Sequence, residues 1–379
     1  MRSCARPPAP TSSTPSFGSI VPTPFTVLRC VACAAVLAAP VLAAPALAQA
    51  PDGAKVKKPA ELFRSEMPFA VTLTTNLDRL KRDRVDKAPW RPATLSYAGD
   101  SARPVTVPIR ARTRGIWRLR KCDLPPLRLD FARENARRTI FRGLDRPKLV
   151  NYCRNTDAYE QYILQELQLY RVYNLLTPAS HRVRLARVTY VDSADAKVEA
   201  VRYGIFLEEP NALAGRLDGR IIETKGATAD DLHPSFTALV GVFAYMIGNT
   251  DLSINGLHNA ELLALPDGTV APVLYDFDFS GAVNARYATA DTSLRIKRVR
   301  DRQFRGLCVP PGEFARVFAL FNERKAAIYQ LYHDDIGALL APRIVDETLK
   351  YYDEFYKTIN DPRAAQRSVL DDCVGKPPA

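Results

Sequence analysis

Alternation of apolar and polar residues marks the first half of the chain as rich in β-strands. Side chains of a strand point to opposite faces in turn, so a period of two indicates a strand with one buried face. Seven segments show this alternation or a short apolar run between turn residues: 69–77, 93–100, 105–120, 125–131, 146–153, 182–193 and 201–210. Together they predict a twisted antiparallel sheet.

A period near that of an α-helix appears in four longer segments. In 157–178, apolar and tyrosine residues recur at spacings of three and four, and Asp157 suits the N-cap. The other helical segments are 234–248, 310–335 and 345–361. We therefore expect a β-rich lobe that holds one main helix, then a mostly helical lobe, with a ligand-binding cleft between them.

The N-terminal residues 1–48 are interpreted as a signal peptide. An Ala/Leu/Val run follows Arg29 and ends in Ala46-Leu47-Ala48, which fits the small-x-small pattern of a cleavage site. We expect cleavage near Ala48, a secreted or periplasmic location, and no transmembrane anchor in the mature chain. The remaining segments are a polar linker, the β-rich lobe, the helical lobe and a polar tail, at 49–66, 67–209, 210–370 and 371–379.

The chain is basic, with a formal net charge of +12. Residues 1–48 contain three arginines and no acidic residue, so the mature chain carries +9. A positive charge favours acidic partners such as phosphates, nucleotides or anionic surfaces, without choosing among them. We expect no nucleic acid partner, because an exported protein rarely meets one.

Four cysteines remain after the predicted cleavage: Cys122, Cys153, Cys308 and Cys373. An even number in an exported protein suggests disulfides, and the absence of a C-x-x-C spacing makes a zinc site improbable. Because two cysteines lie in each half of the chain, we predict the local pairs Cys122–Cys153 and Cys308–Cys373.

Arginines recur along one predicted strand. Arg110, Arg112 and Arg114 are two residues apart, and such residues share one face of a strand. A row of guanidinium groups can bind phosphate oxygens bidentately. An exposed sheet face explains most of them equally simply, and we favour that interpretation. The basic segment 295–306 is likewise interpreted as a surface.

Two polar clusters lie at the ends of a predicted hairpin within 247–281. Asp251 and Asn259 precede its first strand, and Asp276 and Asp278 follow its second. Carboxylate and amide oxygens suit Mg²⁺, and a further carboxylate can accept the proton of an attacking hydroxyl. The same residue types also stabilise ordinary turns through local hydrogen bonds.

The order of short motifs along residues 69–281 resembles the CotH kinase family, secreted or spore-coat kinase-like proteins, and more distantly the HipA kinases. The motifs are "RTRGIWR", "FRGLDRPKLV", "LQELQLYRVYNLL", "YGIFLEEP", "GNTD…HN" and "YDFDFSG". The resemblance implies an α+β, two-lobed protein-kinase-like fold. It also implies phosphoryl transfer from ATP or another nucleotide, with Mg²⁺ or Mn²⁺, to an unknown protein or small-molecule acceptor.

The resemblance implies roles for individual residues in three groups. The catalytic carboxylate is Asp251. The metal ligands are Asn259, Asp276 and Asp278. The nucleotide-binding residues are Lys148, Glu166 and Glu209, with Lys148 pairing with Glu166.

Two features depart from the pattern of the family and of kinases in general. There is no Gly-rich phosphate loop, since Gly115 stands alone. Asp251 and Asn259 are eight residues apart, which is longer than the spacing in the kinase catalytic loop, so Asn255 is an alternative metal ligand. A non-catalytic secreted protein, with a binding or structural role on the same scaffold, is therefore the alternative to an enzyme.

Overall fold

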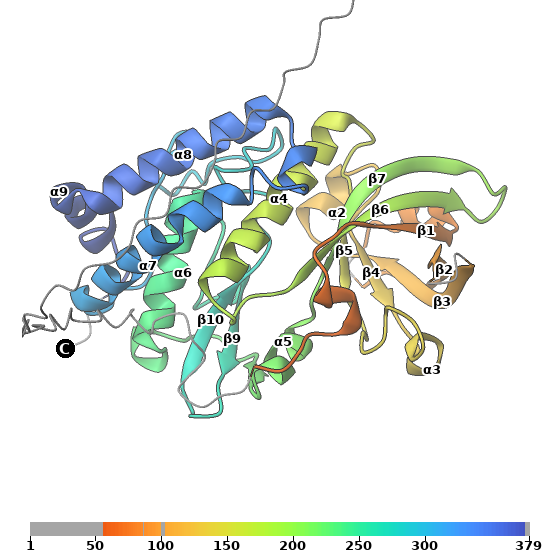
Figure 1. The fold of residues 1–379 in the computed structure, drawn as a ribbon, viewed down its shortest axis with the longest axis horizontal. Helices are drawn as coiled ribbons and strands as arrows, with labels where there is room; N and C mark the ends of the chain where they lie inside the picture. The colour runs from red at the N-terminus through yellow and green to blue at the C-terminus, as the bar shows by residue number, and fades with distance from the viewer. Residues whose placement is uncertain (1–55, 86, 100–102, 376–379) are drawn as a thin grey trace, which may run out of the picture. The chain divides into compact units, whose positions relative to one another are not determined.

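Seven strands close into a barrel, which is the largest feature of the fold (Figure 1). The structure, a computed structural model, describes residues 56–85, 87–99 and 103–375, so the predicted signal peptide lies outside the described residues. The barrel order is β1-β2-β3-β4-β5-β7-β6. Its strands are β1 (Phe69–Thr75), β2 (Arg91–Ala98), β3 (Pro104–Thr113), β4 (Leu127–Asp130), β5 (Lys148–Val150), β6 (Val183–Asp192) and β7 (Val198–Leu207).

The predicted two-lobed protein-kinase-like fold is wrong, because the sheet is closed and mixed. β1 pairs in parallel with β6, from Phe69 opposite Ala186 to Thr75 opposite Asp192, and this pairing completes the ring. The other six barrel pairings are antiparallel. Alternation of residue types shows which face of a strand is buried but not which strand lies beside it. The local sequence pattern therefore does not indicate that β1 pairs with β6.

The chain after residue 210 is not the predicted helical lobe. It contains a second sheet of three strands, in the order β10-β9-β8, and a stretch from 275 to 310 without a helix. The strands are β8 (Arg220–Ile222), β9 (Ala260–Ala264) and β10 (Val270–Leu274). The hairpin of β9 and β10 was predicted, but β8 was not, because a short apolar run cannot be told from a buried helix segment by periodicity alone.

The helices cover a wide range of lengths. The longer ones are α4 (Asp157–Leu176), α6 (Pro234–Ile247), α7 (Pro311–Gln330) and α8 (Pro342–Asn360), close to the four predicted helical segments. The shorter ones are α1 (Leu77–Arg82), α2 (Trp117–Lys121), α3 (Arg133–Ala136), α5 (Pro210–Arg216) and α9 (Pro362–Ala365). Single turns of 3₁₀ helix form at Glu61–Arg64, Ala229–Asp231 and Gly337–Leu339, and a π turn forms at Gln366–Leu370.

Helix α4 lies between the barrel and the helices α6 to α8 (Figure 1). One apolar core fills the barrel, and a second is built by α4, α6, α7, α8 and the β9–β10 hairpin. The ring of Tyr173 on α4 stacks on Phe243 of α6, with 4.5 Å between centroids and 8° between planes. Such aromatic pairs add to the stabilisation from burial. As a result, α4 is fixed on both sides.

The predicted arginine strand ends early, at Thr113. Gly115 has φ of +100°, a conformation that side chains with a Cβ rarely adopt, and the chain then turns into α2. Arg118 on α2 is therefore buried instead of lying on the face of β3. On β3 itself, Arg112 lies over the ring of Trp90, and Arg110 pairs with Asp130.

Both predicted disulfides are confirmed. Cys122 is bonded to Cys153 and Cys308 to Cys373, with Cα separations of 4.4 and 4.9 Å. Two disulfides fit a secreted protein. Among the described residues, no helix combines the length and apolar character needed to cross a bilayer.

The basic segment 295–306 exposes Arg295, Lys297 and Arg298, as expected of a surface, whereas Arg302 is engaged within the protein. Arg298 pairs with Asp301, and Arg302 donates to the backbone carbonyls of Tyr245 and Met246. Its guanidinium also lies 3.4 Å from the ring centroid of Tyr351. Arg302 therefore joins the 282–310 stretch to helices α6 and α8.

The Cys122–Cys153 bond should be important for stability, because it ties the end of α2 to the chain after β5. We expect the double variant Cys122→Ser/Cys153→Ser to lose about 3 kcal/mol of unfolding free energy, since the bond closes a loop of 31 residues. Urea denaturation in non-reducing buffer measures this. An unchanged urea midpoint would show that the bond contributes nothing to the fold.

Candidate functional site

The β9–β10 hairpin brings the two predicted polar clusters together. Ala260 lies opposite Leu274 in the antiparallel register, so the residues just outside this pair are also neighbours. The backbone N–H of Tyr275 donates to the carbonyl of Asn259 at 3.1 Å. The loop that carries Asp251 and Asn259 therefore borders the one that carries Asp276.

The carboxylate of Asp251 is held by two side chains of its own loop. Its Oδ1 lies 2.8 Å from Nε2 of His258, and its Oδ2 accepts from Nδ2 of Asn259 at 3.1 Å. Asn259 also donates to the carbonyl of Asp251. Asn255 points elsewhere, toward the carbonyl of Ala227. The Asp251 side chain remains 42% exposed, so it is oriented and still accessible.

Two tyrosine side chains of helix α4 form hydrogen bonds with the end of β10 and the residues after it. The hydroxyl of Tyr173 accepts from the backbone N–H of Leu274 at 3.4 Å, and that of Tyr170 accepts from the N–H of Asp276 at 2.9 Å. Glu166 lies one turn before Tyr170 on the same stripe of the helix. The tyrosines thus place Asp276 near Glu166.

Three acidic side chains, Glu166, Asp276 and Asp278, interact closely in this region. Burial, and then the charges of Asp278 and Asp276, raise the pKa of Glu166 well above its usual value. Burial and the neighbouring Asp276 raise the pKa of Asp278 to about 7, so that its proton is shared with Asp276. Burial acts in the same direction on Asp276, but Arg114 and Arg118 hold its pKa below the usual value. One acid of the pair is therefore ionised and the other protonated.

The residues that stabilise the charge of the acids are Arg114, Arg118 and Tyr287. The sequence analysis assigned none of them to the site. Arg118 Nη1 lies 3.6 Å from Oδ2 of Asp278, and its Nη2 donates to the carbonyl of Asn151 at 2.8 Å. The hydroxyl of Tyr287 donates to Asp278 at 2.9 Å. Arg114 follows the end of β3. Residue spacing could not reveal these roles, because the turn at Gly115 redirects the chain.

A hollow of about 500 Å³ lies beside the acidic residues. Lys148 and Glu209 line it, together with Tyr275 and Glu261. The ammonium group of Lys148 lies 3.9 Å from the ring centroid of Tyr275. Burial, and then the charge of Arg114, lower the pKa of Lys148 to about 8. The charged form of Lys148 is therefore disfavoured in the hollow unless an anion lies beside it.

Lys148 and Glu166 do not form the ion pair that the resemblance implies, in the part of the chain that the structure describes. The negative charges that act on the pKa of Lys148 are instead those of Glu261 and Asp276, which raise it. Glu209 accepts a hydrogen bond from the backbone N–H of Asp145 at 2.9 Å, and burial raises its pKa. Lys148 and Glu209 thus line one hollow, and Glu166 belongs to the neighbouring acidic cluster.

The acidic cluster offers a divalent cation oxygen ligands of a suitable kind, although the carboxylate oxygens of Glu166, Asp276 and Asp278 do not all lie within 4.8 Å of one another. Glu166 is 1% exposed, yet neither of its carboxylate oxygens has a hydrogen-bond partner among the described residues. Buried polar atoms are normally satisfied, so such orphan oxygens need an explanation. Carboxylate oxygens are the ligands that Mg²⁺ and Mn²⁺ prefer. Glu166 is thus a candidate ligand beside Asp276 and Asp278.

Comparison with known proteins adds no identity: no family model matches the chain, and no curated protein matches its sequence. The resemblance of its motifs to CotH kinase-like proteins therefore stays a hypothesis.

The pKa of Asp278 predicts how stability depends on pH in metal-free protein. Its value of about 7 lies above that of an unfolded aspartate, about 3.9. The folded state then binds more protons between these values, so the free energy of unfolding falls as pH rises through this window. An asparagine at position 278 does not ionise, so the variant Asp278→Asn avoids this loss of unfolding free energy. Its amide can still donate to Asp276.

We therefore expect Asp278→Asn to stabilise the metal-free protein at pH 8 by a few kcal/mol at most, at about 1.4 kcal/mol per pKa unit. Urea denaturation in EDTA at pH 5 and pH 8 measures the change. Asp267→Asn, in the exposed turn of the same hairpin, is the control and should bring no gain at pH 8. A destabilised Asp278→Asn protein at pH 8 would contradict the proposed protonation of the pair.

Proposed function

We propose that this protein is an exported phosphotransferase that moves a phosphoryl group from a nucleotide to an acceptor with the help of a divalent metal. The observation that carries the proposal is the cluster of buried Glu166 and Asp278 with half-buried Asp276, whose charges are incompletely compensated, beside a cation-containing hollow. The proposed location is secreted or periplasmic, after cleavage near Ala48, and the disulfides support it.

The hollow around Lys148 would hold the nucleotide. Ile221, Ile222 and Leu257 offer apolar contacts for a base, and Lys148 and Arg128 offer positive charge for phosphates. Burial, and then the charge of Arg114, lower the pKa of Arg128, so an anion would stabilise its charged form. A volume of about 500 Å³ lies within the range of small-ligand sites.

Glu166, Asp276 and Asp278 would hold the metal, with Asn259 at the edge of the site. When bound, the metal would neutralise negative charge that develops on the phosphates. Arg118 and Tyr287 keep Asp278 in place, and Arg114 adds a positive charge near Asp276. These residues would orient the acids and stabilise their ionised forms.

Asp251 would accept the proton of the acceptor hydroxyl. The contacts from His258 and Asn259 fix the orientation of its carboxylate, and the exposed part of the side chain can meet an acceptor from solvent. A general base must lie within hydrogen-bond reach of the proton that it removes. The acceptor would therefore bind over the loop that contains Asp251.

A thermal-shift screen with nucleotides, each with Mg²⁺ and with Mn²⁺, tests the proposal. A ligand that binds only the folded state raises the Tm, by an amount equivalent to about 2.7 kcal/mol at a hundredfold excess over Kd. We expect a rise that requires both nucleotide and metal, and we expect Asp276→Asn to abolish it, since this change removes an ionised oxygen. Asp267→Asn is the matched control and should respond as the wild type does.

A failure of every nucleotide to bind the wild type would overturn the phosphotransferase proposal. If Asp276→Asn also unfolds the protein, the acids serve only to stabilise the loops.

The role of Asp251 separates an enzyme from a binding protein. We expect Asp251→Asn to keep metal-dependent nucleotide binding and to lower phosphoryl transfer by about 10²–10⁴-fold, the usual contribution of general base catalysis. Release of γ-labelled phosphate to water or to added acceptors measures turnover. Wild-type binding without any turnover would favour the non-catalytic alternative.

A further inference from the structure

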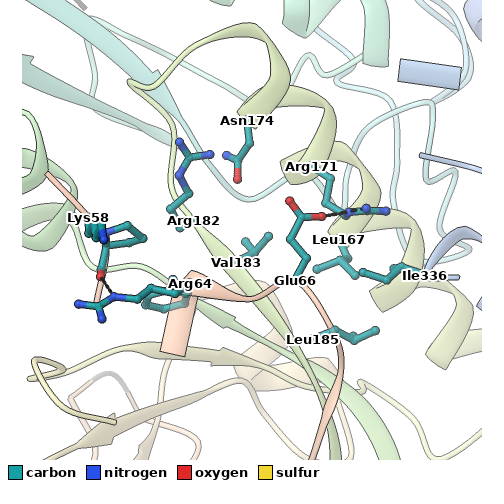
Figure 2. Close-up of a pocket in the computed structure, with 12 residues that line it drawn as sticks. Lys58, Arg64, Glu66, Leu167, Arg171, Asn174, Arg182, Val183, Leu185 and Ile336 are labelled. Atoms are coloured by element: carbon teal, nitrogen blue, oxygen red, sulfur yellow. Dashed lines mark hydrogen bonds and ion pairs between the residues drawn. The ribbon is translucent and has the colours of Figure 1, made fainter. Parts of the chain in front are cut away.

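A separate pocket of about 510 Å³ lies beside helix α4 (Figure 2). Leu167, Arg171 and Asn174 face it, at positions i, i+4 and i+7 of the helix. Glu166 and Tyr170, which serve the candidate site, lie on the neighbouring stripe, one residue or about 100° around the helix. The pocket is thus distinct from the hollow around Lys148.

The pocket has an apolar wall. Leu167 of α4 is joined there by Val183 and Leu185 of β6 and by Phe63 of the first 3₁₀ turn. Each of these side chains is at least 92% buried, so the wall is held firmly by the core and presents a narrow apolar strip to the pocket. A hydrocarbon group placed against it would lose its contact with water, which is favourable by about 0.8 kcal/mol per methylene.

Arg182 gives the pocket an uncompensated positive charge. Its side chain is half-buried, and its guanidinium has no hydrogen bond or ion pair with the residues that the structure describes. Burial, and then the charge of Arg216, lower the pKa of Arg182. The nearby acids are engaged elsewhere, since Glu208 pairs with Arg216 and Glu66 with Arg171. An anion in the pocket would supply the missing partner.

Asn174 extends this polar end. Figure 2 shows its side chain beside Arg182, with Val183 and Leu167 nearby. The Nδ2 of Asn174 is occupied by Ser180 Oγ at 3.0 Å and by the carbonyl of His181 at 2.8 Å. These bonds hold the side chain in place. The pocket therefore has one fixed polar end and one apolar wall.

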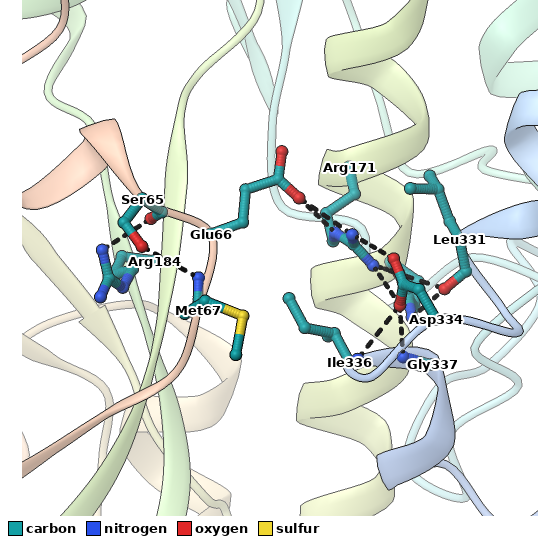
Figure 3. A network of polar contacts seen from close by, with 10 residues as sticks. Ser65, Glu66, Met67, Arg171, Arg184, Leu331, Asp334, Ile336 and Gly337 are labelled. Carbon is teal, nitrogen blue, oxygen red and sulfur yellow. Dashed lines mark hydrogen bonds and ion pairs between the residues drawn. The ribbon is translucent and has the colours of Figure 1, made fainter.

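The remaining walls are held together by Arg171, which is 7% exposed (Figure 3). Its guanidinium pairs with Glu66 at 2.9 Å and with Asp334 at 2.6 Å, and it contacts the carbonyl of Leu331 at 3.4 Å. Asp334 in turn accepts from the backbone N–H groups of Ile336 and Gly337. The pocket is thus formed in advance of binding, which lowers the cost of binding a ligand.

We propose that this pocket binds an amphipathic organic anion, with its charged head on Arg182 and its hydrocarbon chain along Leu167, Val183 and Leu185. The head is a carboxylate or a phosphate monoester, because a guanidinium binds both bidentately. This site is independent of the proposed phosphotransferase site.

Isothermal titration calorimetry with purified protein tests the site, using butanoate, hexanoate and octanoate below their aggregation concentrations. Affinity should rise about fourfold with each added methylene, the equivalent of 0.8 kcal/mol. Octylamine and octan-1-ol are the head-group controls and should bind at least tenfold more weakly than octanoate. If either binds as tightly as octanoate, or if affinity does not depend on chain length, the proposal is wrong.

Octyl phosphate distinguishes the two possible heads. Tighter binding of octyl phosphate than of octanoate assigns the site to phosphate monoesters, and the reverse order assigns it to carboxylates. Binding of neither compound overturns the proposal.

The variant Arg182→Gln tests the role of the guanidinium. We expect octanoate affinity to fall at least tenfold, while the ligand-free protein keeps or increases its urea midpoint, because the change removes a half-buried cation without a partner. Arg142→Gln, at an exposed arginine outside the pocket, should leave both quantities unchanged. Unchanged octanoate binding by Arg182→Gln would overturn the proposal, and a lower urea midpoint would show that Arg182 already has a partner in the folded protein.

Discussion

The gathering of three carboxyl groups in one region, two of them buried and one half-buried, is the constraint on which the rest of this structure depends. Like charges at short distance raise one another's pKa, and burial adds to the effect. Glu166 and Asp278 both respond in this way, whereas the nearby Arg114 and Arg118 hold the pKa of Asp276 below its usual value. A fold that keeps such a cluster must hold the counter-charges rigidly.

Several independent features provide that rigidity. The turn at Gly115 leads the chain from β3 into α2, and the Cys122–Cys153 bond fixes the end of α2 next to the strand β5. Arg118 is further held by the carbonyl of Asn151. The guanidinium therefore stays close to Asp278 although neither residue is near the other in sequence. The barrel serves the site chiefly by carrying these segments.

Local signals predicted some of this arrangement. The D-G turn and the two apolar runs around it predicted the hairpin, and the polar residues at its ends, Asn259 and Asp276, are neighbours in the structure. The four longer helices and both disulfides followed from periodicity and cysteine spacing. Each of these features depends on residues close in sequence or on a small number of possible pairings.

The features that the sequence did not predict are those that depend on distant contacts or on single backbone angles. The parallel pairing of β1 with β6 closes the barrel and contradicts the open, two-lobed arrangement. The segment 105–120 was predicted as one continuous strand, whereas one positive φ value, at Gly115, moves Arg118 to the interior. Alternation of apolar and polar residues predicts neither the β1–β6 pairing nor the turn at Gly115, because it shows only which face of a strand is buried.

The candidate loops contain three of the seven non-glycine residues that have positive φ among the described residues. Leu257, Asn259 and Asp276 all have positive φ, between 50° and 64°, which residues other than glycine rarely adopt. Each such residue costs about 1–3 kcal/mol and persists only where the surroundings hold it. Here the surroundings are the Tyr170 hydroxyl on the N–H of Asp276 and the Tyr275 N–H on the carbonyl of Asn259. Glycine would adopt the angles of Asn259 and Asp276 without strain but would lack their side-chain oxygens, so a requirement for these two side chains accounts for the strain there.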